Sequence, residues 1–172
     1  SWQGPADWMA FARFNLGVAL VRQNRLQDAD PVLTAVGTMD AVGSELRALR
    51  DKANLALGYA WLQAKNPSAA RTALERVRLS GPYSTRALLG VGWADAALGQ
   101  FSEALTPWTE LHERNLLDAA VQESYLAVPY AYDKLNAKAQ AAALYEAAIK
   151  SFNDEAQRID AAVTRIGAGH VL

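Results

Sequence analysis

The sequence of 172 residues contains no cysteine and only two histidines. Without cysteine there can be no disulfide framework, no thiolate nucleophile and no zinc or iron–sulfur site with cysteine ligands. The lack of cysteine suits both the cytosol and the periplasm, so the compartment is left open. No stretch approaches the roughly 18 to 20 consecutive apolar residues of a membrane span, and we expect no such span in this segment. Because the chain begins with Ser1, we expect a processed or excised piece of a longer protein.

An excess of positive charge is also missing. Seventeen Lys and Arg residues stand against eighteen Asp and Glu residues, which gives a formal net charge of -1. A surface that binds nucleic acid needs a basic excess, so we exclude nucleic acid as the expected partner. With 51% hydrophobic and 20% charged residues, the composition is that of a globular protein rather than a disordered or fibrous one. The length fits one domain or one regular array.

The neutral total hides an uneven distribution of charge. Residues 45–86 carry eight basic and three acidic side chains, a local charge of +5, whereas residues 87–172 carry six and eleven, a local charge of -5. Such a dipolar array would steer a partner of opposite pattern, or favour weak end-to-end self-association at low salt. The alternative is chance clustering of charges on solvated faces.

An internal repeat is the main signal in the sequence. Aligning Gly58 with Gly92 gives an offset of 34 residues, and the same pattern of small and large residues begins at Gly17. A small residue follows each glycine after twelve positions, a large one after sixteen and an aliphatic one after nineteen. The three sets of residues are Ala29, Leu33 and Val36; Ala70, Leu74 and Val77; and Ala104, Trp108 and Leu111. A fourth copy has Pro129 in place of the glycine, followed by Ala141, Tyr145 and Ala148. Small residues would let paired helices approach closely, and stacking of the pairs would supply the core.

This pattern resembles the tetratricopeptide repeat (TPR) family, whose unit is a helix-turn-helix of 34 residues with Leu-Gly in its first helix. The resemblance covers nearly the whole chain and implies an all-α, right-handed solenoid of about four repeats, from a longer bacterial TPR protein. On the family register the repeats are 10–43, 51–84, 85–118 and 122–155. A further amphipathic helix over 156–167 is expected to be a cap or the beginning of a fifth unit.

Three prolines fall where regular helices would pass. A proline inside a helix removes a hydrogen bond and costs about 3 kcal/mol. We therefore interpret Asp30-Pro31 and Thr106-Pro107 as delayed starts of second helices, and Pro129 as a kink.

Catalytic and metal-binding patterns are not found in the sequence. His112-Glu113 begins like the helix of a zinc protease, but Leu116 stands where the second ligand would be. His170 falls in a glycine-containing tail, so we expect no metal and no cofactor. Gly90 and Gly92 follow no predicted strand and are interpreted as close helix packing rather than a dinucleotide loop. We predict that the protein is not an enzyme and that His112 lies on the surface of a second helix.

The resemblance also implies a binding surface, because first-helix residues of TPR proteins line a concave groove. Repeat position 9 holds Val18, Tyr59, Trp93 and Tyr130, a row of mostly aromatic side chains. No asparagine occupies this position, so a carboxylate clamp for acidic C-termini is not expected. The candidate residues for binding a partner are Arg22, Lys52, Tyr59, Arg86, Trp93, Tyr130 and Lys134.

Three functions remain open on this basis. The first is a scaffold that binds a protein, through a peptide or partner helix, in the aromatic groove. The second is a structural segment of a larger envelope assembly, whose groove is filled by its own chain. The third is an all-helical enzyme or small-ligand binder with an unusual pocket. Aromatic residues at helical spacing also pack between units, so the groove and the packing interpretations both stand.

Overall fold

The computed structural model describes residues 4–169, and these residues form eight helices and no strand. The helices are α1 (Pro5–Arg22), α2 (Leu26–Gly37), α3 (Ser44–Gln63), α4 (Pro67–Leu74), α5 (Ser84–Ala97), α6 (Phe101–His112), α7 (Ala119–Lys134) and α8 (Lys138–Gly167). Each odd-numbered helix packs on the helix that follows it, and each pair packs on the next pair through α2 and α3, α4 and α5, and α6 and α7. The prediction of an all-α array of helix-turn-helix repeats is therefore confirmed.

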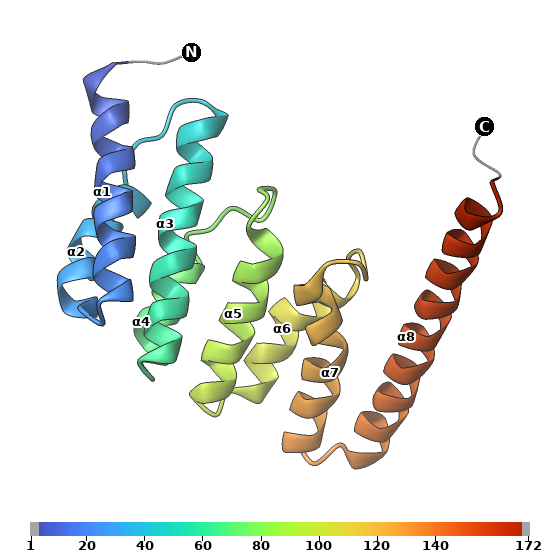
Figure 1. Ribbon diagram of the computed structural model, residues 1–172. Helices are drawn as coiled ribbons and strands as arrows, with labels where there is room; N and C mark the ends of the chain where they lie inside the picture. Colours follow the sequence, from blue (N-terminus) through green and yellow to red (C-terminus); the bar gives the residue numbers. More distant parts are fainter. Residues whose placement is uncertain (1–3, 170–172) are drawn as a thin grey trace.

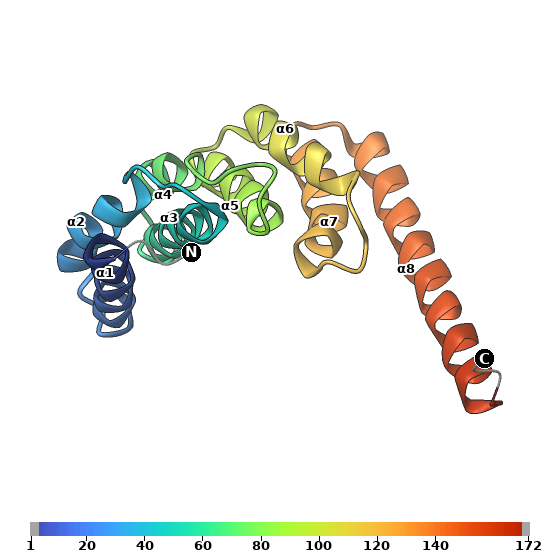
Figure 2. The ribbon, with the colours of Figure 1, turned by 90° about the horizontal axis from the view of Figure 1, so that it is seen from above.

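The hairpins follow one another along a curved ribbon. Figure 1 shows the helices in chain order from one end of the molecule to the other, and Figure 2 shows α1, α3, α5 and α7 on the inner side of the curve, with α2, α4 and α6 outside. The accessible surface is 10242 Å². A compact monomer of this mass would expose about 8200 Å². The larger accessible surface is that of an extended array of hairpins, which does not fold around one central core.

The close approach within each hairpin depends on glycine. A Cβ added at Gly17 would lie 2.5 Å from the Leu33 side chain, and one at Gly58 or Gly92 would overlap Leu74 or Trp108 in the same way. The three glycines therefore have equivalent surroundings, as the internal repeat predicts. The buried clusters extend across neighbouring hairpins; one of them joins Leu55 and Leu74 to Ala87 of the next hairpin. Stacking thus builds the core.

The turn inside each hairpin uses a left-handed residue. Asn24, Lys65, Gly99 and Asn136 occupy equivalent positions and have φ between 57° and 75°. The backbone N–H of the residue that follows each of them reaches back to close the turn, as in the 2.9 Å bond from Asn66 to the carbonyl of Trp61. Only one of the four positions is glycine, so the pattern is hidden in the sequence. Asparagine tolerates this conformation, but lysine does so at a cost.

Replacing Lys65 with glycine is expected to stabilise the protein by about 1 kcal/mol, because the left-handed conformation costs a residue with a Cβ about 1 to 2 kcal/mol. Urea unfolding followed by circular dichroism measures the change. The matched control is Ala64→Gly, whose φ is -78° and which should destabilise the hairpin instead. A loss of stability in the Lys65→Gly variant would contradict the turn described above.

The interpretation of Pro31 and Pro107 as helix starts is wrong. Helix α2 begins at Leu26 and α6 at Phe101, so each proline lies inside a helix. Starting the helices at the prolines would unwind the turns that bury Ala29 and Ala104, both fully inaccessible to solvent. One lost backbone hydrogen bond costs less than this packing. Helix α7 likewise continues through Pro129.

The helix expected over residues 156–167 is not a separate element. It is the second half of α8, which runs for 30 residues without interruption. No glycine or proline stands between Lys138 and Ile166. The ion pair Lys150–Asp154 lies just before the expected boundary and the pair Glu155–Arg158 crosses it, each at 2.7 Å. Residues 44–50, expected to lie between the first two units, form the first two turns of α3. In the described part of the chain, no helix is both long and apolar enough to cross a membrane.

Candidate functional site

The aromatic residues predicted for the groove lie on successive odd-numbered helices. Tyr59 lies on α3, Trp93 on α5 and Tyr130 on α7, and all three side chains are half-buried, as is Val18 on α1. These helices form the inner side of the ribbon (Figure 2). We call the surface formed by Tyr59, Trp93 and Tyr130 the aromatic groove.

Tyr59 is held in place by the next hairpin. Its hydroxyl donates a 2.6 Å hydrogen bond to the carbonyl of Arg86, and the Arg86 guanidinium lies 5.6 Å from the centre of its ring. Burial raises the pKa of Tyr59 to about 12; Arg86 acts in the opposite direction, and Glu123 raises the pKa further. Tyr59 is therefore a neutral hydrogen-bond donor at physiological pH, and its ring bridges α3 and α5.

Trp93 has partners on both sides. Its indole N–H donates a 2.9 Å hydrogen bond to a carboxylate oxygen of Glu123 on α7. Its ring meets that of the buried Trp108 edge to face, with centroids 4.8 Å apart. Tyr130 lies 6.0 Å from Trp93 and 5.9 Å from Phe101. These contacts fix the ring orientations before any partner binds.

Two concavities meet at Tyr59. The first, of about 620 Å³, is mostly apolar and is lined by Val21, Ala56, Tyr59, Ala60, Leu62, Gln63 and Trp93. The second, of about 370 Å³, contains Tyr59 and Leu89 together with the charged side chains of Arg86, Asp118 and Glu123. An apolar chamber next to a charged one can take a large side chain and the polar backbone beside it.

The structure brings together five of the seven residues predicted from the sequence. Tyr59, Arg86, Trp93 and Tyr130 are linked by the contacts above, and the Lys134 ammonium lies 5.5 Å from the Tyr130 ring centre. The other two lie elsewhere. Lys52 lies over the ring of Phe14 at 5.3 Å, and Arg22 is exposed in the last turn of α1. The two concavities are lined by Tyr59, Arg86 and Trp93 of the predicted set and by none of the other four.

Glu123 also lies at this surface, although it was not among the predicted residues. Lys52, Arg86 and Glu123 each stand seven residues before the aromatic residue of their unit, namely Tyr59, Trp93 and Tyr130. This shared spacing is the sequence signal that could have identified Glu123. Its carboxylate accepts from Trp93 and contributes to the charged concavity.

The chemistry of the remaining polar residues is limited. Within residues 4–169 no three side chains of His, Cys, Asp or Glu are grouped so that they could hold a metal ion. The imidazole of His112 stacks on Tyr125, with ring centroids 3.9 Å apart and an interplanar angle of 24°. His112 thus lies on a second helix, as predicted, and its half-buried ring packs against α7. His170 lies outside the described residues.

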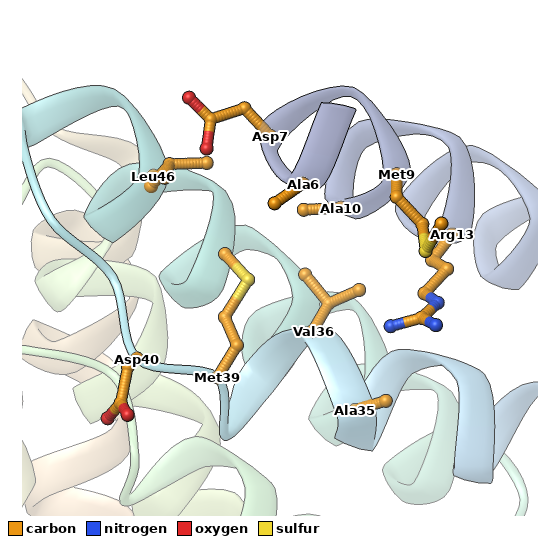
Figure 3. A pocket seen from close by; sticks show the side chains of 10 residues that line it. All are labelled: Ala6, Asp7, Met9, Ala10, Arg13, Ala35, Val36, Met39, Asp40 and Leu46. Atoms are coloured by element: carbon orange, nitrogen blue, oxygen red, sulfur yellow. The ribbon is translucent and has the colours of Figure 1, made fainter. Parts of the chain in front are cut away.

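A small cavity near the N-terminus is separate from the aromatic groove. It measures about 240 Å³ and is bounded by α1, α2 and the beginning of α3. Figure 3 shows Met9 and Arg13 on α1 across from Val36, with Met39 and Leu46 nearby. None of the predicted groove residues lines it.

Comparison with known proteins supports the fold and goes no further. No family model matches the sequence, and no curated protein matches it. Two solved structures of nearly identical TPR-like repeats from a Podosopora anserina protein assigned as a kinesin light chain are similar. The first, a variant with a single substitution, has a TM-score of 0.60 at 16% identity and aligns with 87% of this chain and 76% of that chain. The second has a TM-score of 0.50 at 14% identity, with 86% of this chain and 96% of that chain aligned. The chain therefore has the fold of TPR-like repeats.

Proposed function

We propose that this protein is a non-enzymatic scaffold that binds a partner polypeptide in the aromatic groove. The observation that carries the proposal is the arrangement of Tyr59 and Trp93. Both rings are half-exposed around an apolar concavity, yet both are oriented by hydrogen bonds to the neighbouring hairpin. Rigid aromatic side chains bury a large area on binding and lose little entropy, which is why Tyr and Trp dominate binding hot spots.

The expected ligand is an extended or helical segment with a large apolar side chain. That side chain would enter the concavity between Tyr59 and Trp93, while Arg86, Asp118 and Glu123 would bind its backbone or polar flanks. The alternative is that the rings only pack between hairpins. The half-exposed rings favour binding, because a residue that served packing alone would be buried like Trp108.

Selection from a displayed peptide library tests this function. Peptides selected on the wild-type protein are expected to bind Trp93→Ala and Tyr59→Ala about 30-fold more weakly, which corresponds to hot-spot losses near 2 kcal/mol. Tyr145→Ala, which removes an exposed aromatic ring on α8, is the matched control and should bind as the wild type does. Selected peptides that bind all four proteins equally would reject the aromatic groove as the site.

A second candidate function, a segment of a larger assembly, is favoured by the ends of the array. Tyr145 is 37% exposed, whereas Leu33, Leu74 and Trp108 at the same repeat position are 0%, 1% and 0% exposed. At the other end Leu16 is 52% exposed, against 2% for its equivalent Leu57. Repeat positions that are buried in the inner hairpins are thus exposed to solvent at both ends of the array. Terminal repeats of soluble arrays normally carry a polar outer face.

The exposed apolar face of α8 provides the test of assembly. Ile149, Ile159, Val163 and Ile166 are exposed at spacings that place them along one side of the helix. Sedimentation velocity over a concentration series is expected to show association of the wild type, which Val163→Glu should abolish. Thr164→Glu, an equally charged change at the next exposed position, should leave association intact. A wild-type protein that remains monomeric throughout the series would exclude assembly through this face.

A further inference from the structure

A concavity larger than either of those at Tyr59 lies away from the aromatic groove. It has a volume of about 920 Å³ and lies between α4 and α6, with α5 as its floor. Figure 2 shows α4 and α6 on the outer side of the ribbon. We call this concavity the outer cleft; it shares no lining residue with the two concavities of the aromatic groove.

The outer cleft has a repeat-equivalent counterpart one hairpin earlier, between α2 and α4 over α3. The counterpart measures only about 150 Å³. Its eight lining residues all correspond to residues of the outer cleft at the repeat offsets of 41 and 34. The pairs are Asp30 and Arg71, Thr34 and Glu75, Leu57 and Val91, Trp61 and Asp95, Ala69 and Glu103, Thr72 and Thr106, Ala73 and Pro107, and Arg76 and Glu110.

Trp61 explains why the counterpart is small. Its indole lies across the joint between the first two hairpins and donates a 2.9 Å hydrogen bond to a carboxylate oxygen of Asp30. In the outer cleft the equivalent residue is Asp95, whose short side chain cannot fill the same space. Helix α4 also ends early, after eight residues, and Leu79 in the following loop is 63% exposed at the edge of the cleft.

The exchange of residues also makes the outer cleft acidic. Thr34, Ala69 and Arg76 of the counterpart are replaced by Glu75, Glu103 and Glu110. With Asp95 and Glu113, five carboxylates line the cleft, and the cationic side chain in its lining is Arg71, whose Nε lies 3.0 Å from Glu75 and 3.1 Å from Asp95. The exposed Glu110 also lies 3.5 Å from the guanidinium of Arg114, which is not part of the lining.

Asp95 is the buried group at the floor of the cleft. The residue is 1% exposed. Its Oδ1 is within ion-pair distance of the Arg71 Nε, but the two atoms are not aligned for a hydrogen bond, and both are buried without one. Burial raises the pKa of Asp95, Arg71 lowers it, and Glu75 and Glu103 raise it further. A buried polar atom without a hydrogen bond is costly and calls for a partner.

We infer that the outer cleft binds a basic side chain presented by a partner polypeptide. The guanidinium or ammonium group meets Asp95, Glu103 and Glu110, and the aliphatic stem lies on Leu88, Val91 and Leu105 of the floor and wall. A metal ion is not the ligand, because the carboxylates that line this cleft are not grouped as metal ligands. The apolar lining and the exposed Leu79 favour a polypeptide over a free small cation.

Paired model peptides test the inference. The probes are the acetylated and amidated peptides Ala-Leu-Arg-Leu-Ala and Ala-Leu-Lys-Leu-Ala, and a form with citrulline, which keeps the shape of arginine but has no charge. In titrations at low salt, followed by amide chemical shifts, at least one basic peptide is expected to bind about 10-fold more tightly than the citrulline peptide. The arginine and lysine forms distinguish the two cationic groups. The largest shifts are expected at Val91, Asp95 and Thr106. Equal binding of the charged and uncharged peptides to the wild type would overturn the inference.

Two sets of variants locate the binding. The exposed pair Glu103→Gln and Glu110→Gln should lose most of the preference for the basic peptide, while Glu146→Gln with Asp160→Asn on α8 should keep it. The variant Arg71→Asp with Asp95→Trp installs the Asp30 and Trp61 pair of the counterpart, fills the cleft and should abolish the preference. Tyr59→Ala should not change it, which separates this site from the aromatic groove. A preference that survives in the Gln pair would place the binding elsewhere and contradict the inference.

Discussion

Trp108→Ala is expected to lower the free energy of unfolding by about 3 to 5 kcal/mol, the range for removing a large aromatic side chain from a core. The Trp108 side chain is 0% exposed and lies against Gly92, where even a Cβ would overlap the indole. Its N–H donates a 3.1 Å hydrogen bond to the carbonyl of Leu89, which would lose that donor. Urea unfolding followed by far-ultraviolet circular dichroism measures the loss.

The control for this large effect is Trp8→Ala. Trp8 has the same side chain but is 68% exposed on α1, so its removal should cost less than about 1 kcal/mol. Equal losses in the two variants would mean that Trp108 does not hold α5 and α6 together. Because Trp93 meets Trp108 edge to face, Trp108→Ala should also weaken peptide binding in the aromatic groove.

Asp51→Ala is expected to cost about 3 kcal/mol, the lower end of the range for breaking a buried ion pair, because Arg78 retains some access to water. Asp51 on α3 is fully buried. Its carboxylate accepts a 2.7 Å hydrogen bond from the Arg78 Nε and a 3.3 Å bond from the Arg78 backbone N–H. The pair holds the loop between α4 and α5, and α5 carries Arg86 and Trp93.

A double variant separates the ion pair from the packing of this loop. Asp51→Leu with Arg78→Met replaces both charges by apolar groups and should recover much of the stability lost in Asp51→Ala. The exposed pair Arg25 and Asp28, 2.8 Å apart, gives the control, since Asp28→Ala should cost less than about 1 kcal/mol. A loss of that small size in Asp51→Ala would show that Asp51 does not anchor the loop.

The repeat could be predicted because the packing that it requires is local and periodic. A glycine in the first helix and a large residue sixteen positions later must face each other in every hairpin, and Gly17 with Leu33 or Gly58 with Leu74 preserve this spacing. The aromatic row could be predicted for the same reason, once the family register had been applied to Tyr59 and Trp93.

Other features could not be predicted because they depend on whether local backbone preferences or the energy of tertiary packing is larger. Pro31 and Pro107 oppose a helix locally, but the burial of Ala29 and Ala104 extends the helix past them. Lys65 adopts the left-handed conformation, and because it is neither glycine nor asparagine, its residue type does not indicate this.

The contacts between hairpins could not be predicted from the sequence either. The glycine positions and Pro129 are separated by 41, 34 and 37 residues, so a partner on the next hairpin does not stand at a constant offset. The bond from Trp93 to Glu123 and the replacement of Trp61 by Asp95 therefore become visible only in three dimensions.

Small-angle X-ray scattering of the monomer tests the stacked, curved array most directly. A compact domain of 172 residues would have a radius of gyration of about 16 Å. We predict a value clearly above this, with a distance distribution that is skewed toward long distances, because the hairpins follow one another along a ribbon. A radius close to 16 Å with a symmetrical distribution would mean that the chain closes on itself, leaving neither the aromatic groove nor the outer cleft open to a partner.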